Sequence, residues 1–374
     1  MLTHMRGQGT AALHIGGFLG PFGGAVLAVL LPELQHDFHA SRDAVALAIP
    51  FYLVPFAALQ LGSGFVGARF GIGKTVRLGY IAYALASLAT AIVPNLEGFL
   101  AARFVQGCAN AFITPLLLAT LGEIVPKARL GRSIGTFASV QTGALAASPL
   151  VGGVAGAVDW RLAFIGQALV AAALATLPTV KVARRAPGGQ LRLLRSQPFA
   201  LLCVAGFTGY LGVTGIAVLV SARASDAFAL SPTARGLVLA CFGLAGMLVG
   251  RPLGHVVDRI GRRQSAIVGS VVCAISVAVL PSAPDAVTLA VVWLAAGAGS
   301  VFMWNGLNTL AVESTPSARA AAISVFSACK FAGNAAAPLA WLPIYANSVS
   351  LSFAAAGATC LVVALCAAAY SSSP

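Results

Sequence analysis

The feature that most constrains this chain is its unbroken succession of apolar segments, which runs from near the N-terminus to the C-terminus. Each segment is about twenty residues long, enough for a helix to cross roughly 30 Å of hydrocarbon. Of the 374 residues, 59% are hydrophobic and only 9% are charged, whereas a soluble domain carries about 25% charged residues. The chain has too little polar surface to coat a water-facing body. We therefore predict a polytopic membrane protein.

Charged residues, prolines and asparagines divide the chain into twelve expected membrane helices. They cover residues about 11–31, 44–66, 76–93, 98–121, 133–156, 162–180, 199–222, 236–256, 265–281, 286–310, 320–344 and 351–370. The predicted fold class is an all-α membrane protein with twelve transmembrane helices.

The formal net charge of +13 is concentrated in the short segments between the expected helices. With the N-terminus inside, sixteen Lys and Arg residues fall in cytoplasmic segments and four fall outside, namely Arg42, Arg161, Arg223 and Arg235. Cytoplasmic loops of membrane proteins carry such an excess. We predict a multi-pass protein of the plasma (inner) membrane with both termini in the cytoplasm. The charge thus indicates orientation in a lipid bilayer, and we expect no nucleic-acid partner.

The second half of the chain repeats unusual residues of the first half 190 positions later. Glu123-x-x-Pro126-x-x-Arg129 corresponds to Glu313-x-x-Pro316-x-x-Arg319, and Pro149 matches Pro338 after a slip of one residue. A polar connector lies between the copies. We predict two pseudo-symmetric six-helix halves, residues 1–180 and 199–374, joined by a basic cytoplasmic linker at 181–198. Parallel repeats of this kind hold a substrate site between them near the membrane midplane.

Residues 254–263 form the most specific motif, Gly-His-Val-Val-Asp-Arg-Ile-Gly-Arg-Arg. It resembles the G-x-x-x-D-R-x-G-R-R signature of the major facilitator superfamily and lies after the second helix of a half, where that family places it. The first-half copy, residues 64–71, has Ala68 in place of the acid. The resemblance covers essentially the whole chain. It implies a transporter, not an enzyme, that alternates access by rocking its two halves.

The resemblance also implies that Asp258 helps to latch the cytoplasmic ends of helices from the two halves. The expected latch residues are Gly254, Asp258, Arg259, Gly261, Arg262 and Arg263, with Gly64, Arg69 and Gly71 in the first half. A carboxylate can interact there with a helix N-terminus or with nearby arginines. The alternative interpretation is charge balance within the arginine cluster.

Two further elements resemble family motifs. Arg103-Phe-Val-Gln-Gly107 is similar to the family's R-x-x-Q-G element. Gly143, followed by Ser148-Pro149-Leu-Val-Gly152-Gly153, resembles the antiporter element of the drug:proton antiporter branch, with Ser148 in place of a glycine and one extra residue of spacing. Such a stretch of small residues and proline equally serves close helix packing and a local bend, so both interpretations stay open.

Three cations, Arg103, Arg251 and Lys330, fall inside expected spans, and we expect two of them to be buried. Arg103 shares a helix face with Gln106 and Asn110, and Lys330 shares one with Asn334. A charge at such depth costs at least about 2.5–3.5 kcal/mol and usually faces a cavity or a partner. Each therefore has two interpretations, as a cavity residue that senses substrate or proton or as a structural group bonded to neighbouring helices.

The spans contain no acid in the middle of the membrane to carry a proton. A desolvated lysine can lose its proton, so we hypothesise that Lys330 substitutes for that acid. In the family the first, fourth, seventh and tenth helices line the central path, which makes further residues cavity candidates. They are Tyr210, Trp304, Asn305 and Asn308. The asparagines are equally suited to bonding between helices.

We predict a secondary active transporter that works by alternating access and exports a small organic compound, drug-like or a metabolite, in exchange for protons. Its expected partners are the substrate, protons and the lipid bilayer, and we expect a monomer. No metal cluster, cofactor or ATPase subunit is predicted. The alternatives are uptake or export of an anionic metabolite through a cation-lined cavity and a permease subunit of an ATP-driven complex.

Overall fold

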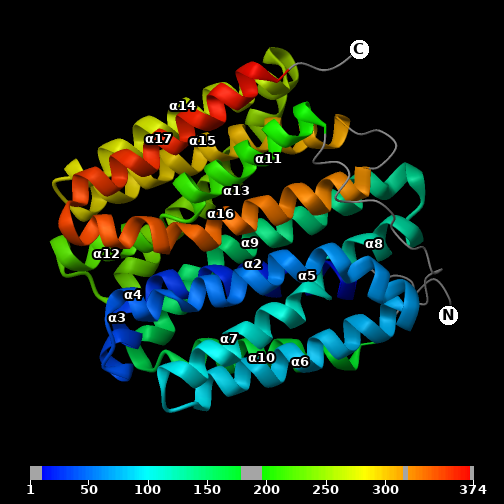
Figure 1. Ribbon diagram of the computed structural model, residues 1–374, viewed down its shortest axis with the longest axis horizontal. Coiled ribbons are helices and arrows are strands. Elements are labelled where there is room, and N and C mark those ends of the chain that lie inside the picture. The colour runs from blue at the N-terminus through cyan, green and yellow to red at the C-terminus, as the bar shows by residue number, and fades with distance from the viewer. Residues whose placement is uncertain (1–10, 178–195, 315–318, 371–374) are drawn as a thin grey trace.

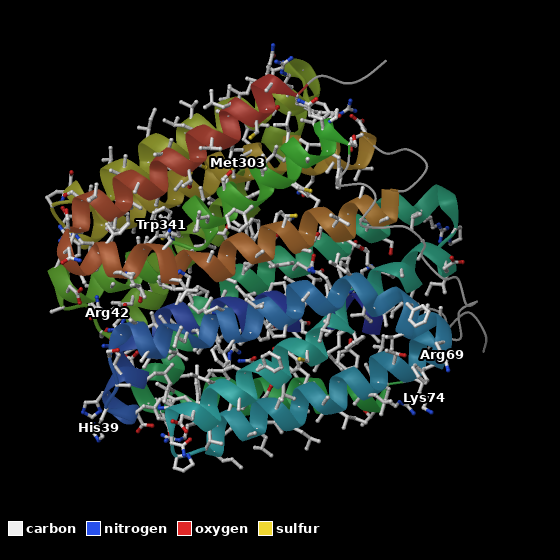
Figure 2. The ribbon with its side chains drawn as sticks, in the orientation of Figure 1. His39, Arg42, Arg69, Lys74, Met303 and Trp341 are labelled. Carbon is white, nitrogen blue, oxygen red and sulfur yellow. The ribbon has the colours of Figure 1, made fainter. Side chains whose placement is uncertain are left out.

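The computed structural model describes residues 11–177, 196–314 and 319–370, and in these ranges it is helical with no strand. Most of the long helices run roughly along the horizontal of Figure 1. Arg69 and Lys74 lie at one end of the molecule, where helix α17 also ends (Figures 1 and 2), and we call this the termini end. His39 and Arg42 lie at the opposite end, which we call the far end.

The first half of the chain forms the lower part of the molecule in Figure 1. Its helices are α2 (Leu19–Ala25), α3 (Leu27–Phe38), α4 (Arg42–Ala46), α5 (Ala48–Phe70), α6 (Ile72–Ile92), α7 (Leu96–Ala111), α8 (Thr114–Ile124), α9 (Lys127–Val158) and α10 (Arg161–Thr176). The second half forms the upper part. It comprises α11 (Gln197–Gly209), η2 (Tyr210–Thr214), α12 (Ala217–Phe228), α13 (Pro232–Ile260), α14 (Arg262–Val279), η3 (Leu280–Ser282), α15 (Ala286–Glu313), α16 (Arg319–Asn347) and α17 (Val349–Ala369).

These elements provide the twelve expected spans. Within the described ranges nine spans are long and apolar enough to cross a membrane, and a tenth consists of Ala11–Ala25 and Leu27–Phe38 with a 50° bend between them. Helices α10, with 16 residues, and α16, with 29, fill the remaining two places. The prediction of an all-α membrane protein is confirmed.

Several spans are interrupted where the sequence analysis expects continuous helices. The fourth span breaks at Phe112–Ile113, just before Pro115 near the start of α8, and a proline lacks the N–H that would continue a helix. The seventh span contains the π-helical turn η2. The first span extends beyond its expected end at residue 31, because α3 continues through Pro32 to Phe38. Glu33 is therefore part of a helix.

The backbone repeats itself at the same 190-residue interval as the sequence. The positive φ angles lie at His39 (48°) and Ala229 (45°) and at Gly71 (94°) and Gly261 (88°). The helix caps repeat as well, since Asn95 accepts from the Gly98 amide and Asp285 from the Thr288 amide. That hydrogen bond holds the pKa of the Asp285 carboxyl below its usual range. The two halves are thus pseudo-symmetric in their local geometry.

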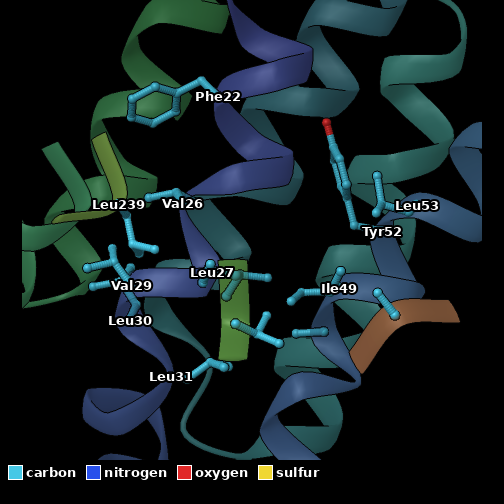
Figure 3. Close-up of a cluster of buried hydrophobic side chains, with 14 of the residues drawn as sticks. Phe22, Val26, Leu27, Val29, Leu30, Leu31, Ile49, Tyr52, Leu53 and Leu239 are labelled. Carbon is cyan, nitrogen blue, oxygen red and sulfur yellow. The ribbon is translucent and has the colours of Figure 1, made fainter. Parts of the chain in front are cut away.

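The halves meet mainly along two helix pairs, α9 with α13 and α5 with α16. The buried apolar core crosses this boundary at the far end, where Leu239 of α13 lies beside Val29 and Leu30 of α3 (Figure 3). Lipid tails are as apolar as these side chains, so helix association in a membrane depends on close packing and hydrogen bonds. The contacts between the halves are therefore where small and polar residues matter most.

Candidate functional site

Arg103 of α7 lies wholly inside the first half, with no exposed surface. Its guanidinium donates to the carbonyl of Gly23 at 2.9 Å, to that of Ala48 at 3.4 Å and to the Gln106 side chain. It also lies 4.3 Å from the centre of the Tyr52 ring. Carbonyl oxygens and an aromatic face satisfy this cation without a carboxylate. The arrangement favours the structural interpretation of Arg103.

The hydrogen-bond network extends from Arg103 through Gln106 to helices α6 and α10, whose polar residues the sequence did not link to Arg103. The Gln106 amide donates to Ser87 Oγ at 2.7 Å and to Gln167 Oε1 at 3.1 Å, and the Tyr83 hydroxyl donates to the same Gln167 oxygen. Polar side chains inside apolar spans need hydrogen-bond partners, so the sequence did indicate that Ser87 and Gln167 bind other polar groups. It did not indicate which groups these are. Asn110, also buried, accepts a hydrogen bond from Thr114.

The repeat allows Arg103 to be compared with the equivalent residue of the second half. The residue 190 positions later is Trp293, which is 1% exposed and donates its indole N–H to the carbonyl of Leu239 at 3.3 Å. Leu239 lies on α13, and α13 is the repeat counterpart of the α5 region that holds Ala48. In both halves a long side chain of the fourth helix therefore donates to a backbone carbonyl of the second. Because Arg103 and Trp293 occupy equivalent positions and make equivalent hydrogen bonds, we infer that both hold the fourth helix of their half against the second.

Lys330 has different surroundings. Its ammonium lies 3.3 Å from the Asn308 side-chain oxygen and 5.2, 5.4 and 5.5 Å from the ring centres of Phe326, Tyr210 and Trp304. Its side chain is partly exposed. None of the ion pairs between described residues involves Lys330. The structure thus holds a cation in an aromatic cage, where each ring contributes about 0.5–2 kcal/mol.

The lysine cluster, Lys330 with Asn308, Tyr210, Trp304 and Phe326, lies at the boundary between the halves. Next to Lys330 in the chain, Phe331 packs against Tyr210 at 5.8 Å and against Phe56 of the first half at 4.7 Å, measured between ring centres. Tyr210 begins the π-helical turn η2, and such turns occur frequently at functional sites. The cluster is therefore linked through Phe331 to the first half.

The predicted cavity residues thus divide between two places. Arg103, Gln106 and Asn110 are enclosed in the first half, whereas Lys330, Asn308, Trp304 and Tyr210 come together at the boundary. Asn305 is exposed on α15. Asn334 lies against Gly215, just after η2. Arg103 and Lys330 therefore do not share one site.

The fifth-span element forms a helix contact. Ser148 Oγ donates to the carbonyl of Phe22 at 2.8 Å, and Gly152 packs against Val26 and Val29 of the first span. Gly153 lies against Pro232 and Gly236 of the second half, and Pro149 also faces Gly236. A side chain at Gly153 would meet the backbone of α13 at 2.6 Å. These small residues allow the two halves to approach closely.

The loop-motif residues lie at the termini end. Arg262 forms an ion pair of 3.1 Å with Glu313, and Arg263 donates to the carbonyls of Ala367 and Ala368. All these partners belong to the second half. Arg69 and Arg259 are exposed, and Gly64 lies in α5. Gly71 and Gly261 have a positive φ angle and form the turns between helices. Gly254 and the side chain of Asp258 lie outside the described residues, so the latch stays a prediction.

The far end holds ion pairs that the sequence analysis did not anticipate. Arg42 of the first half binds both carboxylate oxygens of Asp226 in the second, at 2.7 and 2.8 Å, and the Tyr345 hydroxyl donates to the same carboxylate. Glu33 and Arg235 form a second pair between the halves. The sequence does place residues of opposite charge in the segments at this end. It does not specify which of them pair, because the pairing depends on how the halves pack.

The sequence pattern of the Major Facilitator Superfamily matches residues 13–201 and 202–374. The chain therefore belongs to this family of membrane transporters, and it is not an enzyme. Two solved structures share its fold. A D-xylose–proton symporter is 15% identical, with a TM-score of 0.83 over 96% of this chain and 97% of that one. A POT family transporter is 12% identical, with a TM-score of 0.81 over 96% and 94%.

Curated relatives include named exporters. The chain is 29% identical over 182 residues to the tetracenomycin C resistance and export protein of Streptomyces glaucescens, covering 47% of this chain and 34% of the relative. It is 28% identical over 142 residues to the drug efflux pump JefA of Mycobacterium tuberculosis, covering 37% and 28%. Both matches thus span about a third of the relative. The transporter YwfA of Bacillus subtilis, uncharacterized, matches at 24% over 80% of this chain and 74% of its own length.

Proposed function

We propose that this transporter exports a small organic compound in exchange for protons, and that the substrate binds at the lysine cluster. The observation that carries the proposal is the position of that cluster, where a partly exposed cation and three aromatic rings meet the boundary between the halves. In transporters built from parallel repeats, the substrate site lies between the repeats near the midplane. The names of the two drug-related relatives support the direction of transport.

We further propose that the termini end faces the cytoplasm and that the protein acts as a monomer in the plasma membrane. The excess of basic residues in the segments at that end supports the orientation. The far end, which then faces outward, is closed by the two ion pairs between the halves. The closed far end supports an inward-facing state for this structure.

Transport measured in proteoliposomes under an imposed pH gradient tests proton exchange. We expect uptake of the exported compound into inside-out proteoliposomes to require an acidic lumen and to stop when a protonophore collapses the gradient. A panel of anionic, neutral and cationic aromatic compounds identifies the substrate class in the same assay. Transport that continues unchanged after the gradient collapses would reject proton exchange. ATP dependence would instead support the permease-subunit alternative.

A second candidate function is transport of an anionic metabolite. It is favoured by one observation, namely that the Lys330 ammonium forms no ion pair with a described carboxylate and lies beside aromatic faces. A planar organic anion would supply the missing charge and stack on Tyr210 or Trp304. We keep the hypothesis that Lys330 carries the exchanged proton as well. It is rejected if Lys330→Ala retains both proton coupling and transport rate.

A further inference from the structure

Among the ion pairs between described residues, the pair of Arg235 and Glu33 is the most buried, and it joins the two halves. Arg235 of α13 is 4% exposed and Glu33 of α3 is 16% exposed. The side chains in the other ion pairs between described residues are 27–53% exposed. The Arg235 guanidinium also donates to the carbonyls of Leu230 and Val29, each at 3.3 Å. This pair is therefore anchored to both halves and shielded from water.

The pair leaves two buried atoms without a hydrogen bond. Glu33 binds Arg235 through Oε1, while its buried Oε2 has no partner, and neither has Arg235 Nε. A buried ion pair is favourable only when further hydrogen bonds satisfy its remaining atoms. A carboxylate with one unsatisfied oxygen therefore has an open position for a proton. Protonation there removes the charge that holds Arg235.

Within the described ranges, no other carboxylate near Glu33 is free to pair with Arg235 in its place. On α3, His36 and Asp37 are exposed, and Asp37 is paired with Arg161. From α9, Gly156 packs against Leu30, and a Cβ at Gly156 would lie 3.6 Å from the Glu33 carboxyl carbon. On α12, Arg223 donates to the carbonyl of Pro281, and Asp226 is paired with Arg42.

We propose that Glu33 is a proton-binding group that controls the opening of the far end. A hydronium ion from the far side transfers its proton to Oε2 of Glu33 and leaves as water, while Arg235 keeps its charge. The neutral carboxyl no longer pairs with Arg235, so α3 and α13 separate and the far end opens. Loss of the proton to water re-forms the pair and closes it. This inference rests on the proposed alternating access.

The second pair between the halves serves as a natural control. Arg42 and Asp226 are 27% and 40% exposed, and both carboxylate oxygens are hydrogen-bonded. Exposed pairs contribute about 0–1 kcal/mol because water and salt screen them. Removing the Asp226 charge should therefore weaken closure slightly and leave its pH dependence in place. The matched variants are Glu33→Gln and Asp226→Asn.

The test measures the distance between the halves at the far end by pulsed electron spin resonance on the full chain in lipid nanodiscs. Spin labels are attached to noncanonical residues at the exposed positions 97 and 287, which begin α7 and α15 and correspond in the repeat. This leaves the seven native cysteines untouched. Without substrate or gradient, we expect the ratio of open to closed far ends to rise roughly threefold from pH 8 to pH 4, because a solvated Glu carboxyl has a pKa of about 4.3.

Glu33→Gln should be open to the same extent at every pH, whereas Asp226→Asn should follow the wild-type profile. The exchange Glu33→Arg with Arg235→Glu restores an ion pair and should restore the pH response, which keeps the test valid if the single variant does not fold. A wild-type ratio that ignores pH overturns the proposal, as does a Glu33→Gln variant with the wild-type response. Proteoliposome transport is a separate readout, so proton exchange and the Glu33 gate can fail independently.

Discussion

At the scale of single residues, the two cations within the spans, Arg103 and Lys330, show how neighbours determine what a charge does. Arg103 donates to carbonyls on two helices and lies over Tyr52, all within the first half. Lys330 has Asn308 and three rings around it and remains partly exposed. The first cation is saturated with acceptors, whereas the second still lacks a negative partner among the described residues. We expect their substitutions to have different consequences.

Replacing Arg103 with Met should lower stability and leave substrate affinity per folded molecule unchanged. The change leaves the buried carbonyl of Gly23 and the Gln106 oxygen without their donor, and each such orphan costs about 1–3 kcal/mol. Thermal unfolding in detergent measures the effect, with Arg69→Met, at an exposed arginine, as control. Normal stability combined with lost substrate binding would show that Arg103 belongs to the binding site.

Replacing Lys330 with Met should weaken binding of anionic aromatic compounds while neutral analogues of the same shape bind as before. A hydrogen bond to a charged group contributes about 1.5–3 kcal/mol, which corresponds to a loss of roughly 10- to 100-fold in affinity. Binding to the purified protein measures it, and Lys74→Met, an exposed lysine at the termini end, is the control. An equal loss for anionic, neutral and cationic analogues would contradict charge recognition by Lys330.

At the scale of elements, the pairing of α9 with α13 determines how closely the halves approach. Glycines 153 and 236 bring the two backbones into contact, and the Thr233 hydroxyl donates to the carbonyl of Gly153 at 3.4 Å. The antiporter-like stretch thus lies in the contact that must separate when the far end opens. Packing and a role in the transport cycle are compatible interpretations of this element.

A methyl group at position 236 should therefore destabilise the closed far end. In Gly236→Ala the new Cβ would collide with the carbonyl oxygen of Pro149, and overpacking costs about 1–3 kcal/mol. We expect the open population to rise by tenfold or more in the spin-label measurement. Gly62→Ala, on a face of α5 with no atom within 4 Å, should change nothing. Identical distance distributions for the two variants would refute the close contact.

At the scale of the whole molecule, the far end joins the halves through ion pairs and close helix contacts. At the termini end, the described ion pair is within the second half. The far end is therefore closed, and the lysine cluster lies between the two ends.

Orientation predicts which residues each side of the membrane can reach. In a background without native cysteines, Lys74→Cys should react with an impermeant maleimide only from the cytoplasmic side, because Lys74 lies at the termini end. Val287→Cys, at the exposed start of α15, should react only from outside. Labelling of intact cells and inside-out vesicles measures this. The reverse pattern would overturn the proposed topology.

The sequence by itself determined the fold class, the number of spans, the repeat and the family. A helix in lipid must satisfy its own backbone hydrogen bonds, so length and hydropathy suffice to locate it in the sequence. The family motif lies in one short turn, so it can be identified from neighbouring residues alone. Only the tertiary structure decided that Arg103 is enclosed in one half, that Lys330 is caged by three rings, and that Glu33 meets Arg235 across 202 positions. Such contacts depend on how separate helices pack, because no local pattern specifies which buried charge another helix will face.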